Sequence, residues 1–157
     1  MRIIDNFLPQ IYFNHLKETV LSNNFDWYYQ DCKVEKNDGG QQFTHVFFNE
    51  NKKQSNHLFL LEPILKQLNT KQLIRAKLNF THKDNFIKQF KYHIDTNTNC
   101  STSIIYLNTN NGKTIFKNGK EIESVANRLV EFESKLEHTA TTHTDTSYRL
   151  VLNLNYL

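Results

Sequence analysis

The sequence predicts a mainly β protein of the α+β class, with supporting helices near its N-terminus. Three observations point to this class. The first third of the chain places apolar residues at helical spacing, whereas the remainder consists of short β-like runs separated by turn residues. The length of 157 residues suits one domain. We therefore expect a single domain over 1–157, with 1–72 as the N-terminal support and 73–157 as the β core.

Two stretches of the N-terminal part carry apolar residues at helical spacing, Gln10 to Leu21 and Ser55 to Leu68. Pro9 lies just before the first stretch, as is common at the start of a helix. Pro63 lies inside the second stretch, where it should kink or shorten the helix, because proline lacks the N–H that an interior position donates.

Strand-like runs make up most of the chain. Phe25 to Gln30 and Gln42 to Phe48 are rich in aromatic residues, and eight further runs follow. Asn111-Gly112 and Asn118-Gly119 favour tight hairpins, because both central positions of such turns need positive φ. The count suggests a closed or double-sheet β body but does not distinguish a jelly roll from another barrel. The eight runs are Leu73 to Phe80, Phe86 to Ile94, Ser101 to Asn108, Lys113 to Phe116, Lys120 to Ser124, Arg128 to Glu133, Leu136 to Thr141 and Tyr148 to Tyr156.

The composition argues against several classes of protein. The net charge of +3 is small and the basic residues are scattered among acidic ones, so nucleic-acid binding is not favoured. No positive stretch precedes a long apolar segment at the N-terminus, and no run approaches the length of a membrane span. Cys32 and Cys100 are too few for a disulfide framework. We expect a cytoplasmic protein without membrane association, in the host cytoplasm if the chain is viral.

A histidine and a carboxylate lie two positions apart at His93 and Asp95. Residues at this spacing share one face of a strand, so both side chains can reach one metal ion. Two imidazoles and one carboxylate can hold one face of an octahedral iron(II) and leave three positions open. His138 and His143 are the candidates for the second imidazole. If this segment is a strand, the pocket face consists of Gln89, Lys91, His93 and Asp95, and the opposite face of Phe90, Tyr92 and Ile94.

The last run contains one basic residue, Arg149. A buried arginine without an anion is costly, so an inward Arg149 implies either a carboxylate ligand or an internal acidic residue. Its guanidinium can bind a carboxylate as a bidentate pair. Alternation places Arg149 on one face with Val151, Asn153 and Asn155, and places Leu150, Leu152, Leu154 and Tyr156 on the other.

The order of these residues resembles the iron(II)/2-oxoglutarate dioxygenases, and among them the prolyl 4-hydroxylase-like group with its short, phage-encoded members. The resemblance covers Gln89 to Leu157, through the runs QFKYHID, STSIIYLN, KTIF, NRLVEFESKLEH and RLVLNLNY. A His-x-Asp pair alone would be weak evidence, whereas the ordered set is far stronger. The resemblance implies a double-stranded β-helix, which is a jelly-roll or cupin-like core, with N-terminal helices packed against one sheet.

The resemblance also implies the metal ligands, which would be His93, Asp95 and His138. We prefer His138 to His143 because similar proteins place the basic residue about nine to eleven positions after the distal histidine, and here Arg149 follows His138 by 149 − 138 = 11. His143 should then be an exposed loop residue near the rim.

Five residues are implied to bind the co-substrate 2-oxoglutarate. Arg149 would bind its C5 carboxylate, and the hydroxyl of Tyr106 would bind the same group. Thr102 shares the face of Tyr106 by alternation and is a weaker candidate. The amide of Asn79 would bind the carboxylate at the metal, and Asn153 shares the face of Arg149.

The implied activity is hydroxylation of a C–H bond on a peptidyl proline or related amino acid. Iron(II) would be the cofactor, 2-oxoglutarate and O2 would be consumed, and succinate and CO2 would be released. Ascorbate would support turnover. One alternative is a nucleic-acid oxidative demethylase, but such enzymes carry a second arginine in the last strand, and RLVLNLNYL has none. The other is a non-catalytic β-barrel binding module, against which the intact ligand set argues. The partner is a peptide or a small molecule, the oligomeric state is open, and Gln30 to Gln42 is either a lid or a loop.

Overall fold

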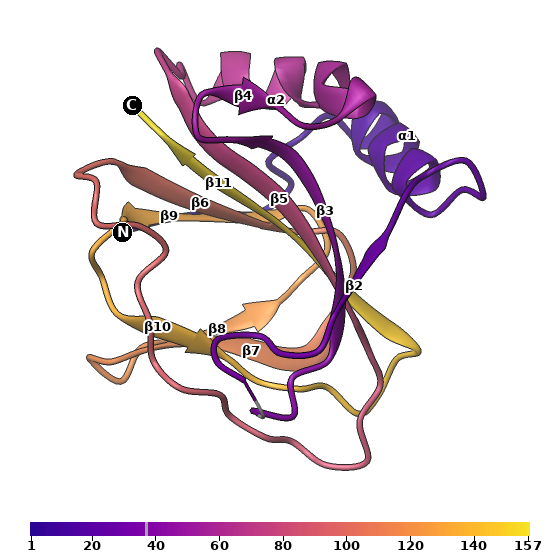
Figure 1. Ribbon diagram of the computed structural model, residues 1–157, viewed down its shortest axis with the longest axis vertical. Helices are drawn as coiled ribbons and strands as arrows, with labels where there is room; N and C mark the ends of the chain where they lie inside the picture. The colour runs from indigo at the N-terminus through magenta and orange to yellow at the C-terminus, as the bar shows by residue number, and fades with distance from the viewer. Residues whose placement is uncertain (37) are drawn as a thin grey trace.

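The computed structural model describes residues 1–36 and 38–157. In this part of the chain two antiparallel sheets face each other, and the helices lie outside the larger sheet (Figure 1). The segment Gln30 to Gln42 includes residue 37, which lies outside the described residues. Whether the segment is a lid or a loop therefore stays a prediction. The elements are β1 (Arg2–Ile4), α1 (Gln10–Val20), β2 (Tyr28–Gln30), β3 (Gln42–Asn49), β4 (Lys52–Lys53), the 3₁₀ helix η1 (Asn56–Leu61), α2 (Glu62–Gln67), β5 (Leu73–His82), β6 (Ser101–Tyr106), β7 (Asn110–Phe116), β8 (Glu121–Ser124), β9 (Arg128–Glu133), β10 (His138–Ala140) and β11 (Tyr148–Tyr156).

The larger sheet has the strand order β1-β9-β6-β11-β5-β3-β2, with β4 paired to β3. Its central strand, β11, is covered on both faces. Leu150, Leu152 and Leu154 belong to the apolar core beneath the helices. Arg149 and Asn153 face the smaller sheet and line a pocket there. The alternation expected for this strand is therefore confirmed.

The smaller sheet has the order β10-β7-β8. The turn between β7 and β8 contains Asn118-Gly119, but only Gly119 has positive φ, at 88°. The N–H of Phe116 donates to Lys120 O at 2.8 Å, and the N–H of Gly119 donates to Phe116 O at 2.9 Å. The connection is thus a hairpin loop of three residues that ends in a left-handed glycine, instead of the two-residue turn expected.

The helices cover the outer face of the larger sheet (Figure 1). Fully buried side chains of α1 and α2, Leu16 and Ile64 among them, pack into the same core as Leu78 and Leu152 of the sheet. Pro63 stands in the first turn of α2, where its missing N–H has no helical partner to lose. The interruption expected at Pro63 is therefore confirmed as a change from 3₁₀ to α geometry. None of the described helices is long and apolar enough to span a bilayer.

The prediction of a strand over Phe86 to Ile94 is wrong. This segment crosses beside β10 with two isolated bridges, Gln89 to Thr141 and His93 to His138, and no continuous ladder. Threonine hydroxyls make several of its other hydrogen bonds: the N–H of Lys88 donates to Thr142 Oγ1, and Thr139 Oγ1 donates to Phe90 O. A segment held partly by side chains keeps no strict alternation, which matters for the pocket.

Two further expectations fail for local reasons. Asn111-Gly112 lies inside β7 at a register shift and not in a turn. A Cβ at Gly112 would lie 3.0 Å from Arg149 Cδ, so this position needs glycine for the close approach of the arginine. The edge strands β1 and β4 were not expected, because runs of three and two residues carry no measurable periodicity.

Candidate functional site

His93 and His138 are brought side by side by the backbone. The N–H of His93 donates to His138 O at 2.9 Å, and the N–H of His138 donates to His93 O at 3.0 Å. This reciprocal pair places the two imidazole rings 4.8 Å apart between their centroids. The ring of His138 also packs against Phe132 and Phe116, which fixes its orientation.

Asp95 completes a cluster of three possible metal ligands. One carboxylate oxygen, Oδ2, lies 3.7 Å from His138 Nε2, and the other, Oδ1, lies 4.0 Å from His93 Nε2. One potential ligand atom from each residue lies within 4.8 Å of the other two. The Asp95 side chain is only 5% exposed. The structure therefore brings together His93, Asp95 and His138, and it does not bring His143 to them.

Both imidazoles present Nε2 to the carboxylate. Nδ1 of His138 is 3.0 Å from Leu136 O, and Nδ1 of His93 is 3.4 Å from Lys91 O. A protonated Nδ1 that donates to a carbonyl leaves Nε2 with a free lone pair. Burial, and then the nearby imidazole of His138, lower the pKa of His93. The neutral form needed for coordination is thereby favoured.

The donor set fits a divalent metal ion. Asp95 Oδ2 is buried and has no hydrogen-bond partner among the described residues, as expected for an oxygen that faces an ion. Cis ligands about 2.1 Å from a metal lie about 3 Å apart, so the three side chains stand slightly wider than an ion would hold them. Two imidazoles and a carboxylate suit iron(II) and leave positions for other ligands.

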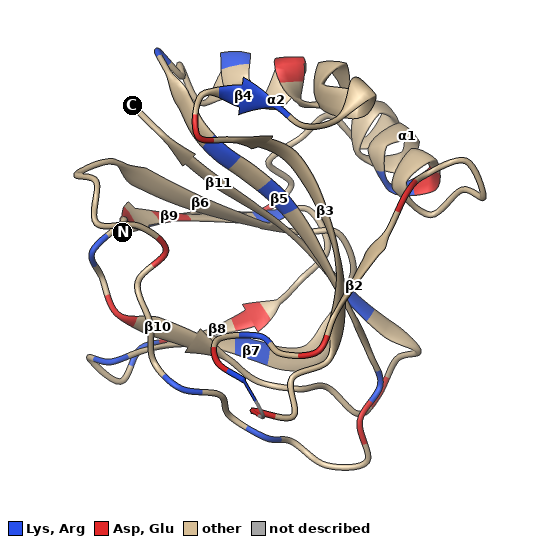
Figure 2. Ribbon diagram, viewed as in Figure 1, with Lys and Arg blue, Asp and Glu red and all other residues tan. Residues whose placement is uncertain are grey.

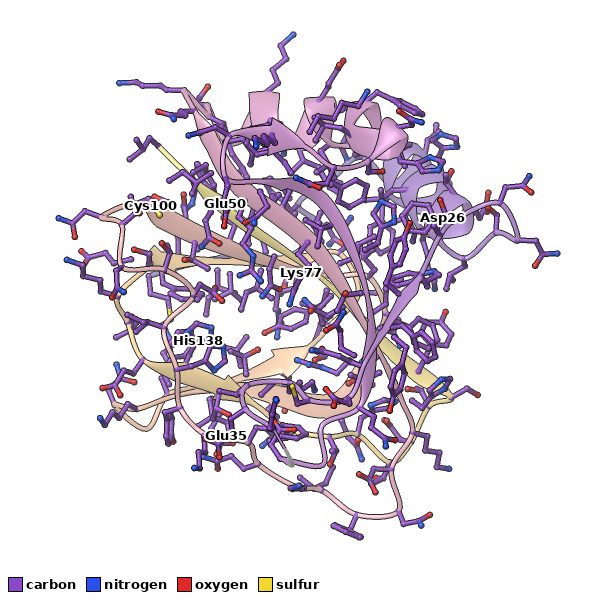
Figure 3. The ribbon with its side chains drawn as sticks, viewed as in Figure 1. Asp26, Glu35, Glu50, Lys77, Cys100 and His138 are labelled. Carbon is purple, nitrogen blue, oxygen red and sulfur yellow. The ribbon has the colours of Figure 1, made fainter. Side chains whose placement is uncertain are left out.

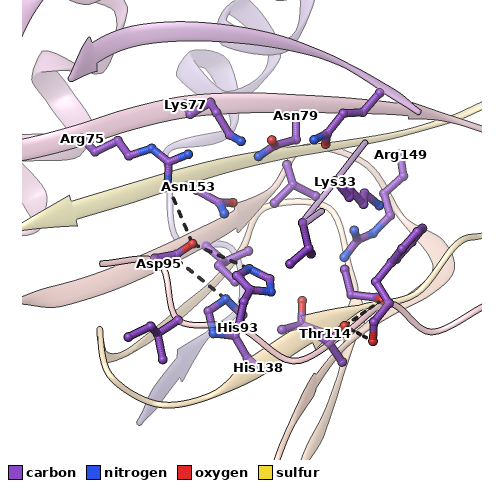
Figure 4. Close-up of a pocket in the computed structure, with 18 residues that line it drawn as sticks. Lys33, Arg75, Lys77, Asn79, His93, Asp95, Thr114, His138, Arg149 and Asn153 are labelled. Carbon is purple, nitrogen blue, oxygen red and sulfur yellow. Dashed lines mark hydrogen bonds and ion pairs between the residues drawn. The ribbon is translucent and has the colours of Figure 1, made fainter. Parts of the chain in front are cut away.

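The cluster lies at one end of a cavity of about 170 Å³ between the two sheets (Figure 4). Figure 3 shows His138 and Lys77 directed into this space from opposite sides. Arg149 lies at the other end, on β11. The wall carries apolar side chains as well as polar ones, namely Phe90, Ile94, Ile104 and Val151.

Arg149 is 5% exposed and lacks an acidic partner among the described residues. Its Nε donates to Ser124 Oγ at 2.9 Å, and its Cζ lies 5.7 Å from the centroid of the Tyr106 ring. Burial lowers the pKa of Arg149, because the charged form is partly desolvated. Of the two explanations for an inward arginine, the carboxylate ligand is the one that this geometry favours.

The other four expected co-substrate residues are placed differently from one another. Asn79 and Asn153 line the pocket, and Asn153 Oδ1 is buried without a hydrogen-bond partner. Tyr106 lies behind the wall, and its hydroxyl donates to Oγ1 of the pocket residue Thr114 at 2.8 Å. Thr102 is fully buried outside the lining, and its hydroxyl accepts a hydrogen bond from Asn155. The structure does not bring Thr102 to the pocket.

Two expectations about exposure are wrong. Phe90 and Ile94 line the pocket, whereas Gln89 and Lys91 are exposed, because the segment around them is not a regular strand. His143 is fully buried, and neither ring nitrogen has a hydrogen-bond partner in the described part of the chain. The loop that carries His143 folds inward, since its carbonyl accepts from the N–H of Asp84.

Sequence reasoning missed six polar residues of the pocket, which are Lys33, Gln42, Arg75, Lys77, Thr114 and Thr139. A signal was present for two of them. In β5, Arg75, Lys77 and Asn79 alternate with Ala76 and Leu78, which is unusual for the interior strand of a sheet. Lys and Arg mark two places on β5 in Figure 2, while other charged residues are spread over loops, helices and other strands. Nothing near Lys33 in the sequence indicated a pocket position.

Titration of Lys33 should raise the free energy of unfolding of the metal-free protein as the pH rises from about 7 to about 10. Its Nζ lies 4.5 Å above the centroid of the Phe90 ring. Burial, and then the charge of Arg149, lower the pKa of Lys33 to about 7. The unfolded chain holds this proton up to about pH 10.4, so unfolding takes up a proton between these values and the free energy of unfolding rises with pH. Urea denaturation at several pH values should show a smaller rise in Lys33→Met. An equal rise in wild type and variant would contradict this, and exposed Lys53→Met is the control.

No protein-family model matches this sequence, and no curated protein matches it. Solved structures with the same fold do exist. A viral collagen prolyl hydroxylase from Paramecium bursaria Chlorella virus-1, in a 2OG complex, is 13% identical, with a TM-score of 0.65 over 98% of this chain and 93% of that one. A Pseudomonas putida prolyl 4-hydroxylase is 14% identical, with a TM-score of 0.69 over 99% and 90%. A prolyl hydroxylase from Trichoplax adhaerens, in complex with a hypoxia inducible factor peptide fragment, is 15% identical, with a TM-score of 0.71 over 99% and 82%.

The expected double-stranded β-helix with N-terminal helices is confirmed by these likenesses and by the two-sheet architecture. At this level of identity the likeness establishes the fold alone, and a fold hosts many activities. The argument for function therefore depends on the side chains of the pocket.

Proposed function

We propose that this protein is an iron(II)- and 2-oxoglutarate-dependent dioxygenase that hydroxylates a C–H bond, with a peptidyl proline or related amino acid as substrate. The observation that carries the proposal is the arrangement of His93, Asp95 and His138 at one end of a cavity, with a buried Arg149 that has no acidic partner among the described residues at the other end. We further infer that residues 1–157 act as one domain, in which the part before residue 73 supports the β core.

His93, Asp95 and His138 would hold the iron through two Nε2 atoms and a carboxylate oxygen. Bound there with 2-oxoglutarate, iron(II) would supply the activation of O2, coupled to oxidation of the co-substrate to succinate and CO2. His138 and Asp95 are buried, so little water is present to compete with their side chains for the metal.

Arg149 would bind the far carboxylate of 2-oxoglutarate, with Nε held by Ser124 and the remaining N–H groups free to donate. Tyr106 supports this end of the pocket through its ring, which stacks near the guanidinium, and through its hydroxyl at Thr114. The amides of Asn79 and Asn153 lie nearer the metal and would donate to the co-substrate through their nitrogens, since 2-oxoglutarate has no hydrogen to give in return.

The apolar part of the wall would keep water away from the reacting atoms. Phe90, Ile94 and Val151 contribute it. An oxidant formed in a dry, shaped site reacts with the bound substrate and not with water or protein, so these residues protect the coupling between co-substrate oxidation and hydroxylation.

The choice of proline follows three of the fold neighbours, whose names describe them as prolyl hydroxylases. A nucleic-acid demethylase is a weaker candidate, because acidic and basic residues are mixed along the described chain (Figure 2) and the net charge of +3 is small. A binding module without turnover is weaker still, since it would have no use for three metal-ligand side chains around one point.

Succinate release tests the proposal. The purified protein is supplied with iron(II), 2-oxoglutarate and ascorbate, and with a panel of proline peptides, free amino acids and alkylated oligonucleotides. We expect succinate and a hydroxylated product from a proline-containing member, and loss of both when a chelator removes iron. Ascorbate is then left out to see whether it supports turnover. If no member and no background reaction gives iron-dependent succinate, the proposed function is wrong.

A further inference from the structure

A second cationic cluster lies beside the candidate metal centre, away from Arg149. Arg75 and Lys77 stand two positions apart on the pocket face of β5. They are opposite Asn155 and Asn153 of β11 in the sheet. Figure 4 shows both side chains above Asp95 and the histidines, with Arg149 farther along the pocket.

Neither cation donates a hydrogen bond to a carboxylate of the described residues. The ammonium of Lys77 makes no hydrogen bond or ion pair with any residue in 1–36 or 38–157. The one carboxylate near Arg75 is Asp95, whose Oδ1 is 3.9 Å from Arg75 Nη1 and so beyond hydrogen-bond range. Burial lowers the pKa of Lys77 to about 8, which marks an ammonium with little solvent. Cations in such surroundings are costly unless a ligand pairs with them.

The net charge of the pocket also favours an anionic ligand near Arg75 and Lys77. Its lining has four basic side chains, Lys33, Arg75, Lys77 and Arg149, and one acidic side chain, Asp95. Iron(II) and 2-oxoglutarate carry opposite double charges, so binding both leaves this positive surplus unchanged. Lys33 is partly neutral because its pKa is lowered to about 7, yet the remaining cations still outnumber Asp95, which favours a further anion in the pocket.

The co-substrate does not serve as that anion for Arg75. Arg149 is opposite Thr81 in the sheet, six residues along β5 from Arg75, which corresponds to about 20 Å of strand. A five-carbon dicarboxylate reaches about 7 Å by its bond lengths. The two arginine side chains reach into the same pocket and shorten this gap, but a dicarboxylate bound at Arg149 and at the metal has both of its ends occupied, which leaves Arg75 to another ligand.

We infer that Arg75 and Lys77 bind a carboxylate of the substrate that is hydroxylated. The inference rests on the proposed function and narrows its substrate to one with an acidic group near the target carbon. That group is either the α-carboxylate of a free amino acid or an acidic side chain next to the target residue in a peptide. The buried, unpaired Asn153 Oδ1 between the clusters accepts an N–H, which both kinds of substrate provide.

Binding to the protein loaded with manganese(II) and 2-oxoglutarate tests this without turnover. The probes are matched pairs: free L-proline against L-prolinamide, and capped tripeptides with Glu or Gln on either side of proline. We expect the acidic member of at least one pair to bind at least tenfold more tightly, or about 1.4 kcal/mol. The first pair reports a free amino acid as substrate, and the tripeptides report an acidic peptide.

The variants Arg75→Gln and Lys77→Gln should each reduce the preference to about twofold or less, and Lys77→Glu should reverse it toward a Lys-containing tripeptide. The exposed Lys53→Gln removes the same charge from the surface and should leave the preference unchanged. Equal binding within all pairs, no binding of any acidic probe, or a preference that survives in both Gln variants would overturn the inference.

The same titrations separate this inference from the proposed function. A wild-type protein that binds neither manganese(II) nor 2-oxoglutarate would contradict the proposed function itself. Normal binding of both, with no preference for acidic probes, would contradict the substrate assignment alone. Loss of manganese(II) or 2-oxoglutarate binding in Arg75→Gln would assign Arg75 to Asp95 or to the co-substrate, and would overturn its substrate role.

Discussion

Replacing Asp95 by alanine or asparagine is expected to weaken iron(II) binding by more than about 100-fold and to abolish succinate release. Asp95 provides the only carboxylate of the cluster, and its buried Oδ2 has no other partner in the described part of the chain. Two imidazoles alone hold iron(II) weakly, because a neutral pair does not balance its charge. Iron binding is measured by anaerobic titration, and turnover by succinate.

His138→Ala should have the same effect, and His143→Ala is its matched control. Both histidines are buried, so both variants lose packing, but only His138 lies beside Asp95. We expect His143→Ala to lower the stability of the protein and to retain iron(II) binding. Unchanged iron affinity in Asp95→Ala, or loss of iron in His143→Ala but not in His138→Ala, would show that the ligand set is assigned wrongly.

Replacing Arg149 by glutamine is expected to raise the 2-oxoglutarate requirement roughly 30-fold to several thousand-fold, which corresponds to about 2 to 5 kcal/mol for a buried partner of a charge. The guanidinium has no acidic partner among the described residues, so its removal leaves the far carboxylate of the co-substrate against an uncharged wall. Iron binding should survive. The apparent Michaelis constant for 2-oxoglutarate and a separate iron titration measure the two effects.

Other variants should weaken 2-oxoglutarate binding to smaller extents than Arg149→Gln. Lysine in place of Arg149 should restore part of the affinity, because it supplies the charge without the planar pair of donors. Tyr106→Phe should weaken 2-oxoglutarate binding by about 0.5 to 1.5 kcal/mol, because it removes the hydroxyl that holds Thr114 in the pocket wall. Arg128→Gln breaks an ion pair with Asp5 at the surface and should not affect 2-oxoglutarate. An Arg149→Gln protein that is merely less stable, with an unchanged 2-oxoglutarate requirement, would make the arginine structural.

Sequence periodicity predicted the parts of the site that lie on regular strands. The alternation in β11 identified Arg149 and Asn153 as inward residues, because a central strand with a core on one face must turn the other face to the second sheet. It failed between Phe86 and Ile94, where threonine hydroxyls and isolated bridges replace a ladder and place Phe90 in the pocket.

The remainder of the pocket depends on contacts between distant segments, which local patterns do not encode. Lys33 reaches the cavity from the segment before β3, and its position depends on Phe90, fifty-seven residues later by 90 − 33. His143 was expected at the surface because its neighbours are polar, yet the loop folds inward and buries it. Arg75 and Lys77 were visible in the alternation of β5, but a polar face acquires meaning only when the opposite sheet is known.

The central claim is that one pocket holds a metal ion through His93, Asp95 and His138 and a dicarboxylate through that metal and Arg149. Calorimetric titration of 2-oxoglutarate into the protein, with and without manganese(II), tests it most directly. We expect one equivalent of 2-oxoglutarate to bind when the metal is present, with binding strongly weakened when the metal is withheld, when Asp95 is alanine or when Arg149 is glutamine. Binding that depends on neither the metal nor Arg149, or no binding of either ligand to the wild-type protein, would contradict the claim.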